Sequence, residues 1–279
     1  MSGIKSTASK APLVKIENGS FAYKGGRQII ENINIALEAG EILAVLGPNG
    51  TGKTTLLRCM MDMLHWDSGR SLLDGEDIRT MSPQKLWQKM AYVPQARTAT
   101  ASYTAFQTVL LGRSSRIGPF SSPKDRDLQA AEEALKRLGI LHLADKACHE
   151  ISGGELQMVL IARAMAAEPE VLVLDEPESN LDFKNQLIVL DAISALAAEG
   201  VGCIFNTHYP AHALQRADKS LLLTKNGMSI YGPTKFVVSE DDIRSIFGVN
   251  AIIGDFGAKT GRVRSVVPIS IAESRNASG

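Results

Sequence analysis

The feature that most constrains this fold is a short apolar run that leads directly into a glycine-rich loop. The apolar run extends from Ile42 to Leu46, and helix-forming residues begin at Leu56. The loop between them matches the pattern G-x-x-x-x-G-K-[ST]. It consists of Gly47, Pro48, Asn49, Gly50, Thr51, Gly52, Lys53, Thr54 and Thr55. Such a loop between a buried strand and a helix is typical of a phosphate-binding site.

The chemistry of this loop depends on its backbone as well as its side chains. Glycines allow backbone N–H groups to converge on phosphate oxygens, and the N-terminus of the following helix adds partial positive charge. We expect Lys53 to reach the β- and γ-phosphates of a nucleotide and the Thr54 hydroxyl to bind Mg²⁺. The alternative is a glycine-rich turn that only caps a helix, but such a turn requires neither the lysine nor the additional glycines.

A second apolar run ends in two carboxylates. Val171 to Leu174 is followed by Asp175 and Glu176, and acidic groups at the end of a buried strand need partners. At the edge where parallel strands end, Asp175 is expected to hold Mg²⁺ through water, and Glu176 to orient and deprotonate an attacking water. An acidic pair after a strand can also be a helix cap. The phosphate loop upstream favours the catalytic interpretation.

The distribution of apolar runs predicts an α/β fold with a P-loop, RecA-like core. The runs 42–46, 171–174 and 201–205 alternate with longer helical segments, as in a parallel sheet that is covered on both faces. Leu13 to Ile16 and Ile33 to Leu37 instead alternate apolar with other residues, which predicts an antiparallel β subdomain at the N-terminus.

A helical insertion is expected to interrupt this core. Leu128, Ala131, Leu135 and Leu138 recur at helical spacing, and no buried strand is evident between about residues 97 and 150. We therefore expect four parts: a flexible tail at 1–12, a nucleotide-binding core with its β subdomain at 13–96 and 164–248, an α-helical subdomain at 97–163, and a C-terminal extension at 249–279. A turn at Lys259-Thr260-Gly261 would suit a hairpin in the extension.

Composition excludes several classes of protein. Lys plus Arg and Asp plus Glu both total 30, so no net positive charge favours nucleic acid. Cys59, Cys148 and Cys203 form no CxxC pair, which argues against a disulfide framework or a zinc site. No apolar run approaches the roughly 18 residues that a membrane span needs. We expect a soluble protein in a reducing cytoplasm.

One further motif narrows the family. Ile151-Ser152-Gly153-Gly154-Glu155 looks like the LSGGQ signature of the ABC ATPases, with Ile for Leu and Glu for Gln. With the phosphate loop and the acidic pair in the same order, residues 13–248 resemble that family. Ser152 and Glu155 also fit an S-x-x-E capping box. A cap does not require the two glycines, however, whereas a helix N-terminus opened by glycines suits a phosphate that arrives from outside the chain.

The resemblance implies an ATP site that is completed by a second copy of the chain. It assigns the ATP contacts to Tyr23, as the aromatic that stacks on adenine, and to the loop from Gly47 to Thr55. It assigns catalysis to Glu176, His208, Gln95 and Lys53, and Mg²⁺ to Thr54, Gln95 and Asp175. The second copy would contribute Ser152, Gly153, Gly154, Glu155 and Asp182. Asp182 ends the segment Ser179-Asn180-Leu181-Asp182, which is similar to the family's D-loop, and Glu178 just before it stands where the family usually has Thr.

The resemblance also implies partners. Without a membrane span, the chain would form a homodimer on separate multi-span permease subunits, at the cytoplasmic face of the membrane, in a system with an extracytoplasmic substrate-binding protein. Thr108 to Arg113, Phe120, Asp127 and Ile246 to Gly248 look like importers of iron-siderophore, haem and cobalamin type. The alternatives are a soluble ABC ATPase without transport, such as one that assists iron-sulfur assembly, and an exporter cassette.

Overall fold

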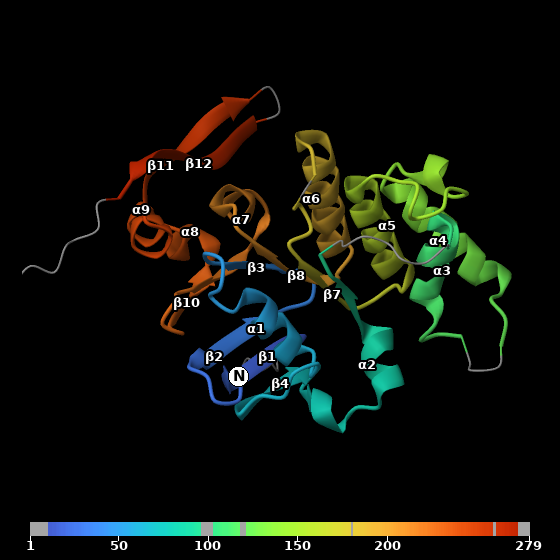
Figure 1. The fold of residues 1–279 in the computed structure, drawn as a ribbon, viewed down its shortest axis with the longest axis horizontal. Helices are drawn as coiled ribbons and strands as arrows, with labels where there is room; N and C mark the ends of the chain where they lie inside the picture. Colours follow the sequence, from blue (N-terminus) through green and yellow to red (C-terminus); the bar gives the residue numbers. More distant parts are fainter. Residues whose placement is uncertain (1–10, 96–102, 118–120, 180, 259–260, 273–279) are drawn as a thin grey trace, which may run out of the picture.

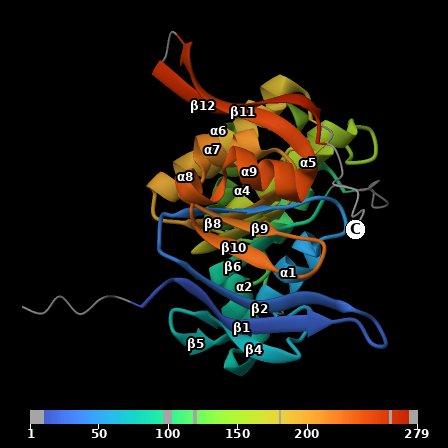
Figure 2. The ribbon, with the colours of Figure 1, turned by 90° about the vertical axis from the view of Figure 1, so that its left-hand side faces the viewer.

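The computed structural model describes residues 11–95, 103–117, 121–179, 181–258 and 261–272. Its parts form a stack in which an N-terminal sheet lies on one side of a central sheet, helices lie on the other side, and a C-terminal hairpin lies beyond those helices (Figure 2). The expected tail before residue 11, Phe120 and Asn180 lie outside the described residues.

Six strands form the central sheet in the order β10-β9-β3-β8-β7-β6 (Figure 1). Their bounds, in that order, are Ser229–Pro233, Lys219–Leu223, Ile42–Leu46, Gly202–Thr207, Val171–Asp175 and Met90–Val93. The strands from β9 to β6 run parallel, whereas β10 pairs antiparallel with β9. The three apolar runs correspond to β3, β7 and β8, which confirms the prediction of an α/β core.

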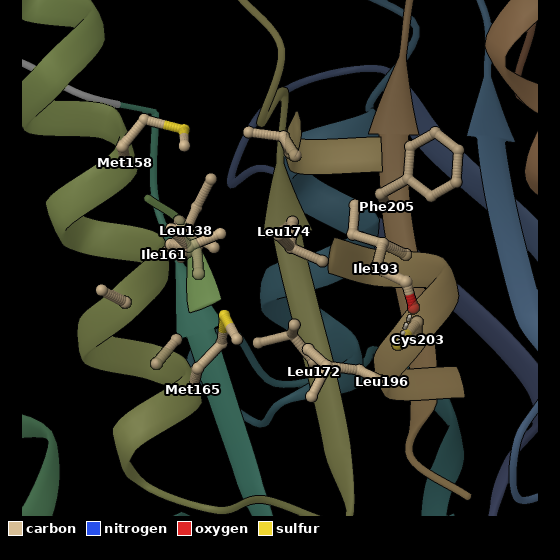
Figure 3. Packing of buried hydrophobic residues seen from close by; sticks show 14 of the residues in the cluster. Leu138, Met158, Ile161, Met165, Leu172, Leu174, Ile193, Leu196, Cys203 and Phe205 are labelled. Atoms are coloured by element: carbon tan, nitrogen blue, oxygen red, sulfur yellow. Dashed lines mark hydrogen bonds between the residues drawn. The ribbon is translucent and has the colours of Figure 1, made fainter. Parts of the chain in front are cut away.

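Both faces of this sheet are buried, because successive residues of each strand enter different cores. On β7, Val171 and Val173 belong to a core shared with the N-terminal sheet, whereas Leu172 and Leu174 belong to a core shared with the large helices. Figure 3 shows this second core, in which Met165 on one helix, Leu172 on β7 and Phe205 on β8 gather around the sheet. A strand buried on both faces can present polar side chains to solvent or a ligand only at its ends.

The N-terminal sheet is antiparallel, as predicted, and longer than the apolar runs alone suggested. Its order is β2-β1-β4-β5, with bounds Gln28–Leu37, Val14–Ala22, Ser68–Leu73 and Glu76–Asp77. Helix α1, Lys53–Met60, contributes Leu56 and Leu57 to the core that this sheet shares with the central sheet. The polar sequence of β4 and the shortness of β6 explain why neither strand was expected from apolar periodicity.

The region between β6 and β7 is helical. It contains α3, Ala105–Leu110, the 3₁₀ turn Leu111–Arg113, α4, Asp125–Arg137, the 3₁₀ turn Leu141–Leu143, and α5, Gly153–Ala166. Ala131, Leu135 and Leu138 are buried, but Leu128 at the start of the predicted stripe is 39% exposed. Leu128 lies in the first turn of α4, so the buried apolar stripe begins one turn later than expected.

A buried ion pair ties this helical region together. Arg113 Nε donates to Asp127 Oδ1 at 3.0 Å, and both side chains are almost completely buried. The Arg113 guanidinium also donates to the Ala166 carbonyl at the end of α5, at 2.9 Å. Removing one member of such a pair leaves the other charge without compensation.

The remaining helices lie outside this helical region, and a hairpin follows the last of them. These helices are α2 before β6, Pro83–Lys89, and, after β7, α6, Phe183–Ala198, α7, Pro210–Arg216, α8, Thr234–Val237, α9, Glu240–Asp242, and the π-helical turn Ile243–Phe247. Strands β11, Val249–Ala258, and β12, Gly261–Ile271, pair with each other and contact α7 (Figure 2). In the described part of the chain, no helix combines the length and apolar character of a membrane span.

The three cysteines are buried and free. Burial raises the pKa of Cys59 and of Cys203 to about 12, so both thiols stay protonated at neutral pH. Cys203 belongs to the core on the helical face of the sheet, where it acts as a small apolar side chain.

Phe205 offers a direct test of this core. Phe205→Ala should lower the free energy of unfolding by about 3–5 kcal/mol, because the side chain is fully buried and its removal leaves a cavity. Phe183→Ala is the matched control, since that side chain is 87% exposed and its loss should change stability by about 0.5 kcal/mol or less. Urea unfolding of both variants checks the difference. Equal losses would contradict the placement of Phe205.

Candidate nucleotide site

The predicted site residues converge because four neighbouring parallel strands end at one edge of the sheet. In spatial order these strands are β3, β8, β7 and β6. The phosphate loop follows β3, His208 follows β8, Asp175 and Glu176 end β7, and Gln95 follows β6. The carboxyl ends of parallel strands are where open α/β sheets bind ligands.

The phosphate loop wraps around its own lysine. Lys53 is 5% exposed, and its Nζ donates to the carbonyl oxygens of Gly47 at 2.8 Å and Pro48 at 3.2 Å. Gly52 has φ 95°, and a Cβ there would stand 2.6 Å from Ile29 Cγ2, so this position requires glycine for both conformation and space. The lysine contacts and the left-handed glycine together define the curve of the loop.

Lys53 is also the positive centre of the site. Burial lowers the pKa of Lys53, while the negative charges of Glu176, Asp175 and Glu178 act in the opposite direction. Its Nζ lies 3.1 Å from His208 Nδ1. The lysine and the histidine are thus direct neighbours, although 155 positions separate them in the sequence.

Asp175 is held by three donors. Thr54 Oγ1 donates to Oδ1 at 2.9 Å, Asn206 Nδ2 donates to Oδ1 at 2.6 Å, and Tyr92 OH donates to Oδ2 at 3.1 Å. Burial, with the charge of Asp175, raises the pKa of Tyr92 to about 12, so its phenol keeps the proton that it donates.

The donor set around Asp175 fits Mg²⁺. The Thr54 hydroxyl, the Asp175 carboxylate and the Gln95 amide all offer oxygen, which is the ligand type that Mg²⁺ prefers. Within the described ranges, no group of three or more His, Cys, Asp or Glu side chains suits a metal ion. A magnesium ion at this edge would therefore share its ligands with a nucleotide and water rather than sit in a cage of protein groups.

Glu176 lies at the centre of a second network. Its Oε2 accepts from Ser179 Oγ at 3.0 Å and from Gln95 Nε2 at 3.3 Å, and its Oε1 pairs with His208 Nε2. Its backbone N–H donates to Asn206 Oδ1. Glu176 has φ 49°, a left-handed conformation that few non-glycine residues adopt.

Tyr23 lies beside the end of the phosphate loop. Its OH and Thr55 Oγ1 are 3.1 Å apart. The residue is 47% exposed, and its ring packs edge-on against that of Phe21, with 5.0 Å between the ring centroids. An exposed aromatic ring next to a phosphate loop can stack on a base.

The signature-like segment forms the N-terminus of α5. Ser152 and Glu155 make the capping box: Glu155 N donates to Ser152 Oγ at 3.3 Å, and Ser152 N donates to Glu155 Oε2 at 2.8 Å. The Ser152 backbone N–H and hydroxyl, which both donate to Glu155 Oε2, lower the pKa of Glu155. Ser152 and Gly153 are exposed, and no atom would obstruct a Cβ at Gly153. Asp182 caps α6 by accepting from Asn185 N at 2.8 Å.

Sequence reasoning missed several residues of this site. Asn206 and Tyr92 hold Asp175, Ser179 holds Glu176, and Thr207 and His212 approach Glu178. Asn206 left one signal, since it is a polar residue inside an apolar strand and is fully buried. The others became identifiable only when the strands were placed side by side.

Fold and site together define a P-loop nucleotide-binding protein. A lysine-centred phosphate loop, oxygen ligands for a cation, and a carboxylate linked to histidine are the parts that phosphoryl transfer to water requires.

Comparison with known proteins narrows this class to one family. The family model described as ABC transporter matches residues 30–179. An uncharacterized ABC transporter ATP-binding protein of Methanocaldococcus jannaschii is 39% identical over 86% of this chain and 93% of its own length. The molybdate import ATP-binding protein MolC of Haemophilus influenzae is 36% identical over 84% of this chain and 87% of its own length.

A solved structure agrees with these relatives. A protein described as a metal-chelate type ABC transporter, in an inward-facing conformation, superposes with a TM-score of 0.81 and 33% identity, over 92% of this chain and 97% of that chain. The chain belongs to the ABC transporter ATP-binding proteins and is an ATP-hydrolysing transporter subunit.

Lys53 provides the test of nucleotide binding. ATP at a hundredfold excess over its dissociation constant should stabilise the parent by about 2.7 kcal/mol, because a ligand that binds only the folded state shifts the unfolding equilibrium. Lys53→Ala should lose most of this shift, and Tyr23→Ala should reduce it modestly. Thermal melts with and without Mg-ATP measure it. A parent protein whose melt does not respond to ATP would exclude the site described here.

Proposed function

We propose that two copies of this chain close around two Mg-ATP molecules and hydrolyse them to drive import of a metal chelate through separate membrane subunits. The observation that carries the hydrolytic part is the meeting of Lys53, Glu176 and His208 at one edge of the sheet.

ATP binding exchanges the partners of Lys53. The ammonium group now donates to two loop carbonyls, and the β- and γ-phosphates take over these hydrogen bonds as stronger, charged acceptors. The loop from Gly47 to Thr55 supplies backbone N–H groups, and the start of α1 adds its partial positive charge. The exposed ring of Tyr23 packs on the adenine.

Thr54, Gln95 and Asp175 are the proposed ligands of Mg²⁺. When bound, the ion neutralises charge on the phosphate oxygens. Asn206 and Tyr92 keep Asp175 in place, and Asn206 also accepts from the backbone of Glu176, so one buried amide orients both acids. The side chains therefore meet the nucleotide in fixed positions, which lowers the cost of reaching the transition state.

Glu176 is the proposed general base. Its carboxylate orients the attacking water and accepts its proton, while Gln95 and Ser179 hold one of its oxygens. His208 contacts Glu176 through one ring nitrogen and Lys53 through the other, so the imidazole links the base to the group that neutralises the γ-phosphate. His208 and Lys53 then stabilise charge on the transferring phosphoryl group.

The second copy completes the site with Ser152, Gly153, Gly154, Glu155 and Asp182. The exposure of Ser152 and Gly153 at the start of a long helix supports this assignment, because such an N-terminus can receive a phosphate from another chain. The proposed moving parts are the core, residues 13–96 and 164–248, and the helical region 97–163. ATP drives closure because it binds the closed state more tightly than the open one.

Glu176→Gln tests this mechanism. The variant should bind ATP normally, hydrolyse it about 10² to 10⁴ times more slowly, and accumulate as a closed dimer, because glutamine keeps the size of the side chain but cannot accept the proton. Light scattering with ATP measures the dimer, and phosphate release measures the rate.

Adding Ser152→Arg provides the control. The bulky side chain at the proposed interface should return the trapped species to monomers without removing any residue of the phosphate loop. A Glu176→Gln protein that stays monomeric with ATP bound, or hydrolyses at the parent rate, would refute the role of Glu176.

Transport and its direction rest on relatives. The structural neighbour described as metal-chelate type supports import of a chelate, while MolC is named for molybdate. The helical region offers an apolar groove of about 480 Å³ lined by Tyr103, Gln107, Leu110 and Leu111, among others, and we propose it as the contact with the membrane subunits. In this arrangement the ATP-binding subunit contacts the permease at the cytoplasmic face and never the transported substrate.

Leu111→Glu tests this contact. The tagged parent should capture a multi-span membrane protein from detergent-solubilised native membranes, and Leu111→Glu should capture about tenfold less, because a charge would be buried in an apolar contact. Met228→Glu is the matched control, since Met228 is similarly exposed and lies in the turn between β9 and β10. Capture of soluble proteins alone would favour the alternative of an ABC ATPase without transport.

A further inference from the structure

A second acid in the turn after β7 is buried instead of lining the nucleotide site. Glu178 lies two residues after Glu176, and its side chain is 1% exposed. A carboxylate is costly to bury, and most proteins do so only where it has partners.

The Glu178 carboxylate meets the segment that carries His208. Its Oε1 accepts a hydrogen bond from Thr207 Oγ1, at the end of β8. His212 Nδ1, in α7, lies 3.6 Å from the same oxygen, within ion-pair distance and beyond hydrogen-bond distance. Among the residues that the structure describes, none hydrogen-bonds Oε2. Its partner across the turn is therefore the Thr207 hydroxyl.

The hydroxyl of Thr207 has one proton, and its hydrogen-bond partners determine the direction of the O–H bond. Tyr209 N donates to Thr207 Oγ1 at 3.0 Å, so this oxygen acts as the acceptor for the residue after His208. Thr207 Oγ1 donates its proton to Glu178 Oε1, while its lone pair accepts from Tyr209 N. A threonine at position 178 could donate as well as accept, and would leave the direction of the bond open.

These two hydrogen bonds fix the chain on both sides of His208. Thr207, which precedes His208, is fully buried and hydrogen-bonded to Glu178. Tyr209, which follows His208, donates its backbone N–H to Thr207 Oγ1. His208 itself contacts Glu176 and Lys53. The turn that presents Glu176 is thus linked to the segment that presents His208 by a route separate from their direct contact.

We propose that Glu178 is a positioning residue that, through the direction it imposes on the Thr207 hydroxyl, holds His208 against Glu176 and Lys53. This inference rests on the proposed function, because it assigns a role in the same ATPase site. With a side chain that is 1% exposed, Glu178 is assigned a role that it exerts through Thr207 and His208.

Thr207 supplies the first test, because its variants change no charge. Thr207→Val removes the hydroxyl at nearly constant shape and should lower kcat for phosphate release about 10- to 100-fold, since small displacements of catalytic groups have effects of this size. KM for ATP should change by about twofold or less, because the phosphate loop is untouched. Thr207→Ser restores the hydroxyl and should recover most of the rate. Equal rates for the two variants would overturn the proposal.

Glu178 supplies the second test, in two backgrounds. Glu178→Gln should lower kcat about tenfold in the parent and by about twofold or less in His208→Ala, because a residue that acts through His208 has no effect once the imidazole is absent. Glu178→Thr, which buries no charge, repeats the measurement if the glutamine variant unfolds. The same loss in both backgrounds, or no loss in the parent, contradicts the proposal.

Two histidine variants distinguish an effect on this network from a general effect of losing a histidine. His212→Gln removes the imidazole beside Glu178 and should lower kcat severalfold. His65→Gln removes an exposed imidazole that pairs with Asp62, and should leave kcat unchanged. Failure of the proposed function is recognised separately, since the parent would then not hydrolyse ATP at all or would not depend on His208. A hydrolysing, His208-dependent parent that tolerates every Glu178 and Thr207 variant overturns only the inference.

Discussion

The site depends on one constraint, which is the burial of both faces of the parallel sheet. Since β3, β8 and β7 are enclosed by apolar cores, the only positions where these strands can present polar side chains without a large desolvation cost are their ends. The ends of adjacent strands lie close together. Lys53 and His208 are therefore in contact, although they lie far apart in the sequence.

Charge balance is the second constraint at this edge. Three acids, Asp175, Glu176 and Glu178, surround the Lys53 ammonium, and their charges offset part of the effect of burial on its pKa. Asn206 supplies its oxygen to the backbone of Glu176 and its amide hydrogens to Asp175. Asn206 thus contacts both adjacent acids, of which Asp175 accepts from Thr54 and Glu176 contacts His208.

The sequence predicted the parts of this site that local backbone geometry dictates. Glycines such as Gly52 are required by a left-handed turn against Ile29, and the acids must follow a strand, so both leave a pattern in the linear chain. The α/β core and the antiparallel N-terminal sheet were predicted for the same reason, since burial on one face or two produces different periodicities. The strand β4 was not, because its first three residues are exposed and polar.

The contacts across the sheet left no such pattern. The contact between Glu178 and His212 joins segments that follow two different strands, and Leu128 was expected in the buried stripe because helical spacing alone does not show which turns of a helix are covered. Glu178 itself was visible only as a departure from a family pattern. The contact that suggests a role for Glu178 is with Thr207, which is 29 residues away in the sequence and fully buried.

The hydrogen bonds of Lys53 to its own loop have a further consequence. Because Gly47 and Pro48 accept from the ammonium group, the side chain of Lys53 holds the start of the loop against the start of α1. Entry of a phosphate then replaces one set of acceptors by another, and little of the binding free energy is spent on ordering the chain.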